Sequence, residues 1–288
     1  MCPFYDGERI FGHGGFRDSH ADCWRKGGQS METAADGGYI KSVLRAAELL
    51  RVLATGDGPM SLGELSGHLG WAKSTTHGIL STLTAVSLVE QRQSDGKYGL
   101  GIRAFELGCA ARRTWRELSS QKHLQHLTME TGESAFLATA DGTDTVLLDT
   151  AMVTGNYRIL SPVGTRKPIY CSSHGKVLLA FRPEAEREAL IRRLRFEKYT
   201  PATVQDAEAL RASCREIREQ GYCVENGEYR MGLCSVSAPV FDMDGAAKYA
   251  VGIVGLARDS KAPEVLKGIS RVRAAAEALT RELAQQKG

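Results

Sequence analysis

The residues best suited to chemistry lie in the stretch CSSHGK, residues 171–176, at the start of an apolar run. Serine is a common N-cap, so the stretch predicts the beginning of a helix with two candidate caps. The first backbone amides of a helix have no intrahelical acceptor, and the helix dipole adds partial positive charge beside them. These amides therefore favour an anion such as a carboxylate. A plain N-cap without a ligand is the alternative.

Two other chemistries fit this stretch poorly. A phosphate-binding loop needs glycine five residues before its Gly-Lys pair and Ser or Thr after it, but the chain has Tyr170 and Val177 there. Cys171 and His174 could act as a thiol nucleophile and its base, but neighbours at one helix start seldom point at each other, and no third orienting group is evident. No catalytic residue, metal ligand or cofactor is assigned.

A second stretch, from Lys73 to Val86, has the side chains of a DNA-reading helix. At 100° per residue, one half is mostly apolar and the other holds small hydroxyl residues. The first half contains Thr76, Ile79, Leu80, Leu83, Val86 and Ser87; the second contains Ser74, Thr75, His77, Gly78, Ser81 and Thr82. Without an acid in the stretch, the hydroxyl face can enter a major groove without repelling phosphate. An ordinary amphipathic surface helix is the alternative for this segment alone.

The residues before this helix predict a helix-turn-helix. Ser61 and Glu64 have the spacing of a capping box, so a helix is expected to begin at Ser61. Gly70 can take the left-handed conformation that ends a helix, which leaves a short turn before Lys73.

The residues after it predict a β-hairpin, or wing. Residues 88–91 and 97–100 are strand-like, and Ser-Asp-Gly at 94–96 forms the turn. Arg92 and Lys97 near the tip can contact phosphate, which contributes affinity but carries no sequence information.

Composition sets weaker limits. The chain has 288 residues, 42% of them hydrophobic and 25% charged, which gives room for two globular domains. A net charge of +3 is too small to argue DNA binding by itself. Seven cysteines without a CxxC pair fit reduced thiols, and no secretion signal or membrane-length apolar run is present, so we expect a cytoplasmic protein.

Several motifs together resemble the IclR family of transcriptional regulators, over residues 40–283. They are SVLRAAELLRVLATGDGPMSLGELSGHLGWAKSTTHGILSTL, DGKYGLG, VGTRKPIYCSSHGKVLLA and GYCVENGEYRMGLCSVSAPVFDMDG. The resemblance implies an α+β fold, in which a winged helix-turn-helix domain is joined by a linker helix to a GAF-like mixed α/β effector-binding domain. It also implies a regulator that binds a double-stranded DNA operator and responds to a small organic acid.

The expected organisation has four parts. Residues 1–38 lack apolar periodicity and predict a disordered tail; Met31 stands where similar chains often begin, so the first 30 residues are hypothesised to lie upstream of the true start. Cys2, His13, His20 and Cys23 match no usual zinc spacing. The winged domain spans 39–101, the linker helix region 102–131 and the effector domain 132–286.

The effector domain is expected to hold an antiparallel-type sheet flanked by helices. Its predicted strands are 134–140, 145–150, 157–163, 222–225, 234–241 and 249–256, and its predicted helices are 172–181, 183–194, 205–220 and 263–284.

The resemblance implies where the effector binds. Ser173 and His174 would offer backbone amides, and Glu225, Ser235, Gly252 and Val254 would line the pocket. Many members have Asp and Cys at the positions of Glu225 and Ser235, and serines at those of Gly252 and Val254. We therefore expect a larger, less polar pocket without a metal. The expected effector is an acid that is aromatic, or one with a hydroxyl group that can donate a hydrogen bond to Glu225.

The candidate DNA contacts are Ser61, Lys73, Ser74, Thr75, His77, Gly78, Ser81, Arg92, Lys97 and Tyr98. Relatives often carry Arg where this chain has Gly78, so base reading is expected to rest on Lys73, Ser74, Thr75 and His77. We expect a homodimer or a dimer of dimers on a partly palindromic site. The alternative function is an enzyme or sensor whose helix-turn-helix serves only for protein contact.

Overall fold

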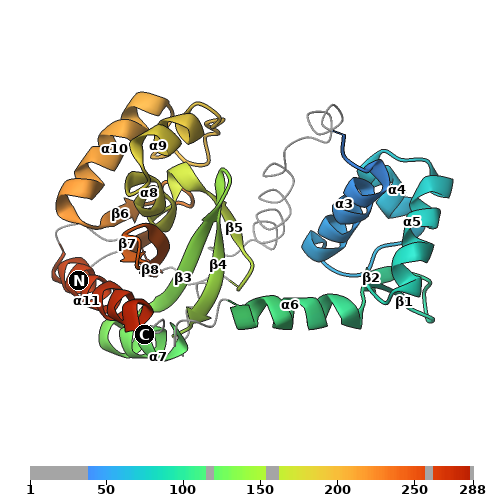
Figure 1. The fold of residues 1–288 in the computed structure, drawn as a ribbon, viewed down its shortest axis with the longest axis horizontal. Coiled ribbons are helices and arrows are strands. Elements are labelled where there is room, and N and C mark those ends of the chain that lie inside the picture. The colour runs from blue at the N-terminus through green and yellow to red at the C-terminus, as the bar shows by residue number, and fades with distance from the viewer. Residues whose placement is uncertain (1–37, 115–119, 154–161, 257–261, 286–288) are drawn as a thin grey trace, which may run out of the picture. The chain divides into compact units, whose positions relative to one another are not determined.

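A computed structural model describes residues 38–114, 120–153, 162–256 and 262–285 of the chain. These residues form two compact units that divide after Thr114 (Figure 1). The predicted tail, with its Cys and His residues, lies outside the described residues except for Gly38. None of the described helices is both long and apolar enough to cross a membrane.

The N-terminal unit is a winged helix-turn-helix, as the sequence predicts. Its elements are α3 (Lys41–Thr55), α4 (Leu62–Leu69), α5 (Lys73–Ala85), β1 (Val89–Gln91), β2 (Tyr98–Leu100) and α6 (Ile102–Thr114). The capping box is present, because the Glu64 amide donates to Ser61 Oγ at 3.2 Å and the Ser61 amide donates to Glu64 Oε2 at 2.7 Å. Gly70 ends α4 in the left-handed conformation, with a φ of 66°. Both predicted signals for the helix-turn-helix are confirmed.

The core of this unit comes from α3, α4, α5 and the wing. Leu49, Leu65, Leu80 and Val89 are buried together. The wing also gains an unpredicted partner, because Met60 and Tyr98 exchange backbone hydrogen bonds of 2.9 and 2.8 Å. This bridge fastens the wing to the residue that precedes the N-cap of α4.

The C-terminal unit is built on a six-stranded, fully antiparallel sheet with the order β5-β4-β3-β8-β7-β6. The strands are β3 (Ser134–Asp141), β4 (Asp144–Ala151), β5 (Arg166–Pro168), β6 (Cys223–Asn226), β7 (Leu233–Phe241) and β8 (Ala247–Leu256). Five of these match predicted strands closely. The expected strand at 157–163 is different: residues 157–161 lie outside the described residues, Pro162 and Val163 are not in a strand, and β5 begins at Arg166.

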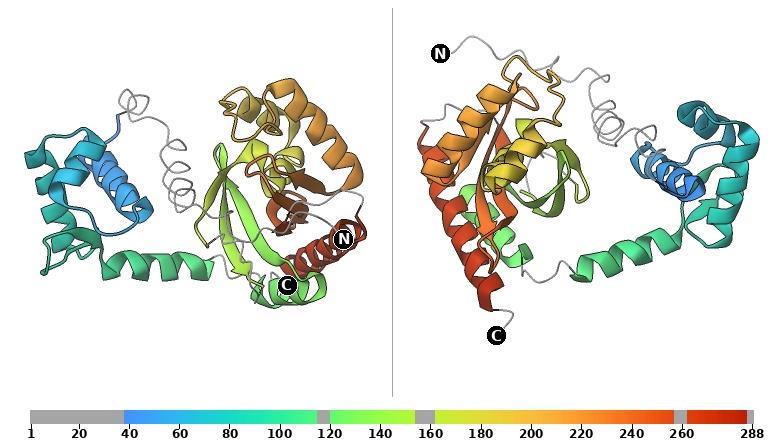
Figure 2. Two further views of the ribbon diagram at one scale, coloured as in Figure 1. Left: turned by 180° about the vertical axis from the view of Figure 1, so that it is seen from behind. Right: turned by 45° about the horizontal axis from the view of Figure 1, so that its top comes forward.

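Helices cover both faces of this sheet (Figures 1 and 2). They are α7 (Ser120–Thr131), the short 3-10 helix η1 (Ile169–Cys171), α8 (Ser173–Ala180), α9 (Glu184–Ile191), α10 (Ala207–Gln220) and α11 (Pro263–Gln285). One core joins α7 and α11 to one face, through Leu127, Val251 and Leu279. A second core joins η1, α8, α9 and α10, through Ile169, Leu178 and Leu210. Helix α8 rests on the opposite face of the sheet, over β3, β7 and β8.

The predicted linker region divides between the two units. Helix α6 belongs to the N-terminal unit, whereas α7 packs within the C-terminal unit. The physical reason is apolar burial: Leu124 and Leu127 of α7 are almost fully buried against the sheet and α11.

Candidate DNA-binding surface and effector site

Helix α5 presents most of its predicted contact residues to solvent. Lys73, Ser74, His77, Gly78 and Ser81 are exposed, and Thr75 is half-buried. Gly78 has no side chain and therefore adds no bulk to the exposed face. The space beside it is open, because a Cβ there would have no neighbour within 4 Å. The surface is thus made of small hydroxyl groups, one imidazole and one ammonium group.

The other side of α5 holds the helix in the unit. Thr76, Leu80 and Leu83 are buried, and Thr76 Oγ1 donates to the Ala72 carbonyl at 3.2 Å. Val86 and Ser87, predicted on this apolar half, are exposed instead because the helix ends at Ala85.

Tyr98, one of the predicted DNA contacts, departs from that expectation. It is only 7% exposed and packs in the core of the unit, so its ring supports the wing from inside. The Ser61 hydroxyl is engaged as the cap of α4. Arg92 is exposed and pairs with Asp95 at 3.2 Å across the wing turn, while Lys97 is half-buried. Among these four, Arg92 has the most open approach to a phosphate.

The predicted anion-binding site at the start of α8 has the expected backbone geometry. Ser172 is the N-cap of α8: its Oγ accepts the Gly175 amide at 3.3 Å and its carbonyl accepts the Lys176 amide at 2.9 Å. The amides of Ser173 and His174 come before the Lys176 amide and therefore have no intrahelical acceptor. Gly175 is required for close packing, because a Cβ there would lie 2.6 Å from Ser172 Oγ.

Strand register places the other predicted effector residues on one face of the sheet. Ser134, Val254, Ser235 and Glu225 form one row across β3, β8, β7 and β6. Phe136, Gly252, Ser237 and Cys223 form the next row on the same face. Helix α8 packs on this face, and Ser173 Oγ lies 2.7 Å from Ser237 Oγ. The six predicted positions thus share one region.

Glu225 is engaged with the protein itself. Its Oε1 accepts the amides of Glu228 and Tyr229 at 2.6 and 3.3 Å, and its Oε2 accepts the Ser235 hydroxyl at 2.8 Å. These bonds fix the loop that follows β6. The sequence predicts that Glu225 accepts a hydrogen bond from a ligand hydroxyl, but both of its carboxylate oxygens already accept hydrogen bonds within the protein.

A buried ion pair joins this loop to α8. Lys176 Nζ donates to Glu228 Oε1, and the Lys176 side chain is 4% exposed. Burial disfavours the ammonium form, but the neighbouring Cys223, Glu228 and Glu225 outweigh it and raise the pKa of Lys176. Burial raises the pKa of Glu228 despite its bond to Lys176. Sequence reasoning assigned no role to either residue.

Gly252 does not open the pocket, contrary to the sequence prediction. A Cβ at this position would lie 2.5 Å from Ser237 Oγ and 2.8 Å from Phe136 Cζ. The space that glycine leaves is filled from the neighbouring strands, because register pairs Gly252 with both of these residues.

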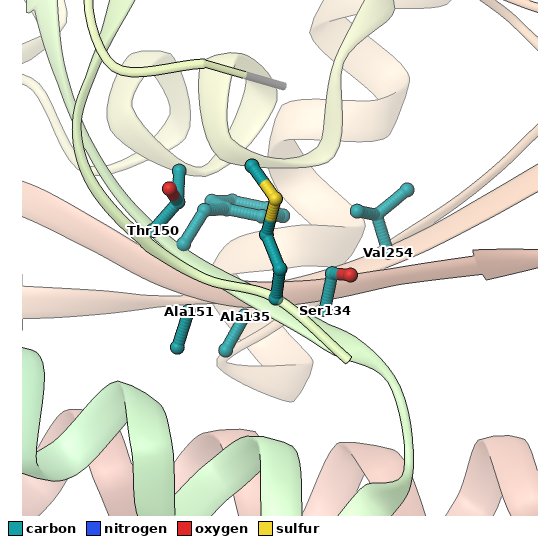
Figure 3. A pocket seen from close by; sticks show the side chains of 7 residues that line it. Ser134, Ala135, Thr150, Ala151 and Val254 are labelled. Atoms are coloured by element: carbon teal, nitrogen blue, oxygen red, sulfur yellow. The ribbon is translucent and has the colours of Figure 1, made fainter. Parts of the chain in front are cut away.

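A small pocket nevertheless lies beside Val254. Its lining consists of Ser134, Ala135, Phe136, Thr150, Ala151, Met152 and Val254. Figure 3 shows Thr150 and Val254 on the upper side of the strands, while Ala135 and Ala151 point the other way. The site predicted from the sequence did not include Ser134, Phe136 and Thr150, although the alternation of side chains along β3 and β4 places them on the same face. Within the described chain, no cluster of three His, Cys, Asp or Glu side chains suits a metal ion.

Phe136 separates this pocket from the start of α8. Its ring lines the pocket and packs edge-on against the His174 ring, with centroids 5.0 Å apart and an interplanar angle of 68°. His174 is 2% exposed, and burial, with a smaller effect from the Lys167 charge, holds the pKa of its imidazole well below the ordinary value.

Known proteins match both units. Residues 42–93 match the IclR helix-turn-helix domain, and residues 117–281 match the family described as bacterial transcriptional regulator IclR C-terminal. The HTH-type transcriptional regulator BhcR of Paracoccus denitrificans is 32% identical over 232 residues, covering 80% of this chain and 82% of the relative.

Solved structures share the fold. A putative transcriptional regulator from Rhodococcus sp. RHA1 has a TM-score of 0.72 and 26% identity, covering 85% of this chain and 99% of that one. An IclR homologue from Microbacterium hydrocarbonoxydans, solved with 4-hydroxybenzoate, has a TM-score of 0.71 and 23% identity, covering 84% and 99%. The curated relatives are transcriptional regulators and not enzymes. The chain therefore belongs to the IclR family of DNA-binding transcriptional regulators, with a C-terminal effector-binding domain.

Proposed function

We propose that this regulator binds its operator as a homodimer, or as a dimer of dimers, and that a small organic acid bound in the C-terminal unit controls it. The observation that carries the DNA-binding part is the exposed face of α5, which has Lys73 at its start and bears no acidic side chain. A recognition helix needs such a face to approach base edges between two phosphate backbones.

We expect the His77→Ala variant to lose sequence discrimination. His77 is exposed near the middle of α5, so removing its imidazole removes a hydrogen-bonding group from the proposed base-reading face. The loss of one base contact should lower the ratio of the affinity for the selected DNA to the affinity for random DNA about tenfold. The probe is DNA selected by the wild-type protein from a random pool, compared with unselected DNA in a titration at fixed salt.

The matched control is His126→Ala, because His126 is an exposed histidine on α7 of the other unit. It should leave both affinities unchanged. An equal ratio for the wild type and His77→Ala would remove His77 from the base-reading set. A selection that enriches no sequence with wild-type protein would overturn the proposal that the exposed face of α5 reads base edges.

Exposed apolar side chains support pairing of two copies through the N-terminal unit. Ile40 and Val43 at the start of α3 and Ile102, Phe105 and Leu107 on α6 all face solvent. Large apolar side chains grouped on two helices are a common sign of an interface. We propose that a second copy of the chain covers them, which would also place two recognition helices on one operator.

Phe105→Glu is expected to weaken the dimer at least tenfold, because it would place a carboxylate in an apolar contact. Sedimentation velocity across a concentration series measures this change. Met129→Glu, at an exposed apolar position on α7, is the control and should sediment like the wild type. If Phe105→Glu dimerises as well as the wild type, the pairing surface lies elsewhere.

The start of α8 supports an acid as the effector. The amides of Ser173 and His174 are unpaired within the helix, and the apolar side chains of Phe136 and Val254 lie on the sheet face below. The relative from Microbacterium hydrocarbonoxydans was solved with 4-hydroxybenzoate, an acid that combines a carboxylate with an apolar ring. An acid of this kind would place its carboxylate at the amides and its apolar part toward Val254.

A further inference from the structure

The imidazole of His174 lies buried at the proposed anion-binding site, at the start of α8, without a hydrogen-bond partner. It is 2% exposed, and neither Nδ1 nor Nε2 bonds to any of the described residues. Leaving a buried polar group unsatisfied carries a desolvation cost that no hydrogen bond offsets. Buried polar atoms in native proteins are almost always bonded, so this ring needs an explanation in terms of function.

The other polar side chains of the site already have partners. Ser173 Oγ is bonded to Ser237 Oγ, and the carboxylate of Glu225 is bonded to Ser235 and to the amides of Glu228 and Tyr229. Glu228 Oε2 is also buried without a partner, but that carboxylate is already paired with Lys176 through its Oε1. Among the described residues of the site, His174 is therefore the buried side chain whose polar nitrogen and oxygen atoms make no hydrogen bond at all.

The ring is held neutral, which fixes what it can bind. Burial is the main cause, and the positive charge of Lys167, on β5 at the sheet edge, acts in the same direction. A neutral imidazole has one N–H donor and one acceptor nitrogen. A carboxylate can accept from the donor but has no hydrogen to give to the other nitrogen. A hydroxyl group can satisfy that acceptor.

We propose that the His174 side chain reads a hydroxyl group of the effector, so that the protein selects hydroxylated organic acids over the corresponding plain acids. This inference rests on the proposed acid-binding function and assigns to His174 the hydroxyl recognition that the sequence suggested for Glu225. The backbone amides at the start of α8 hold the carboxylate, and the ring of the second residue in that helix binds the hydroxyl.

The test compares matched acids: glycolate with acetate, mandelate with phenylacetate, and 4-hydroxybenzoate with benzoate. Thermal shift and calorimetry are run on the wild-type protein, with the amide of each acid as a control for the carboxylate. We expect at least one hydroxylated acid to bind about tenfold or more tightly than its plain partner. His174→Leu should remove that preference while the plain acid still binds.

His174→Gln supplies a donor and an acceptor in a similar space and should keep part of the preference, which separates hydrogen bonding from packing. His126→Leu is the control for an exposed histidine and should change nothing. Equal binding of hydroxylated and plain acids by the wild type would overturn the proposal, even if His174→Leu fails to fold, and would leave acid binding intact. Failure of every acid to bind the wild type would overturn the proposed acid-binding function as well.

Discussion

Replacing Lys176 with methionine is expected to lower the free energy of unfolding of the C-terminal unit by about 3–5 kcal/mol. Lys176 is buried in α8 and bonds to Glu228, whose carboxylate is also largely buried. The variant would leave that carboxylate without its cation in a region of low polarity. Breaking a buried pair from one side costs far more than the pair itself contributes, because the remaining charge has lost its solvation.

The measurement is urea unfolding followed by circular dichroism, with the double variant Lys176→Met/Glu228→Gln beside it. The double variant removes both charges and should recover much of the lost stability. Lys122→Met, at an exposed position on α7, controls for the loss of one ammonium group and should stay within about 0.5 kcal/mol of the wild type. If Lys176→Met lowers the free energy of unfolding no more than Lys122→Met does, the carboxylate of Glu228 is not stabilised by this pair.

Replacing Phe136 with alanine is expected to cost about 3–5 kcal/mol of stability and to change which acids bind. The ring is 3% exposed and lies between the pocket beside Val254 and the His174 ring. Its removal would join the pocket to the start of α8 and would also free the space above Gly252. The preference among acids should therefore move toward larger ones, such as mandelate over glycolate.

Calorimetry with these two acids checks the shift in preference, and urea unfolding checks the stability. Phe241→Ala is the matched control, because Phe241 packs edge-on against Phe181 with centroids 5.4 Å apart and does not line the pocket. It should destabilise the protein without altering the order of the acids. An unchanged order in Phe136→Ala would show that acids do not pass or contact this ring.

Local chemistry explains why so much of the fold was predictable. A capping box, a left-handed glycine and an N-cap serine each involve residues within about one helical turn, so Ser61, Gly70 and Ser172 can be read directly from the chain. Alternating and helical periodicities likewise come from the immediate neighbours, and they predicted most strands within one or two residues.

The content of the effector site, by contrast, depended on tertiary structure. Gly252 suggested an open wall, but strand register sets it between Phe136, more than a hundred residues earlier, and Ser237. Register likewise joins Glu225 to Ser235, and the loop after β6 uses the remaining carboxylate oxygen. The sequence alone thus determined which helices and strands form and to which family the chain belongs. Which side chains fill a gap, share a charge or stay without a partner was decided by contacts between distant segments, because no short-range pattern encodes them.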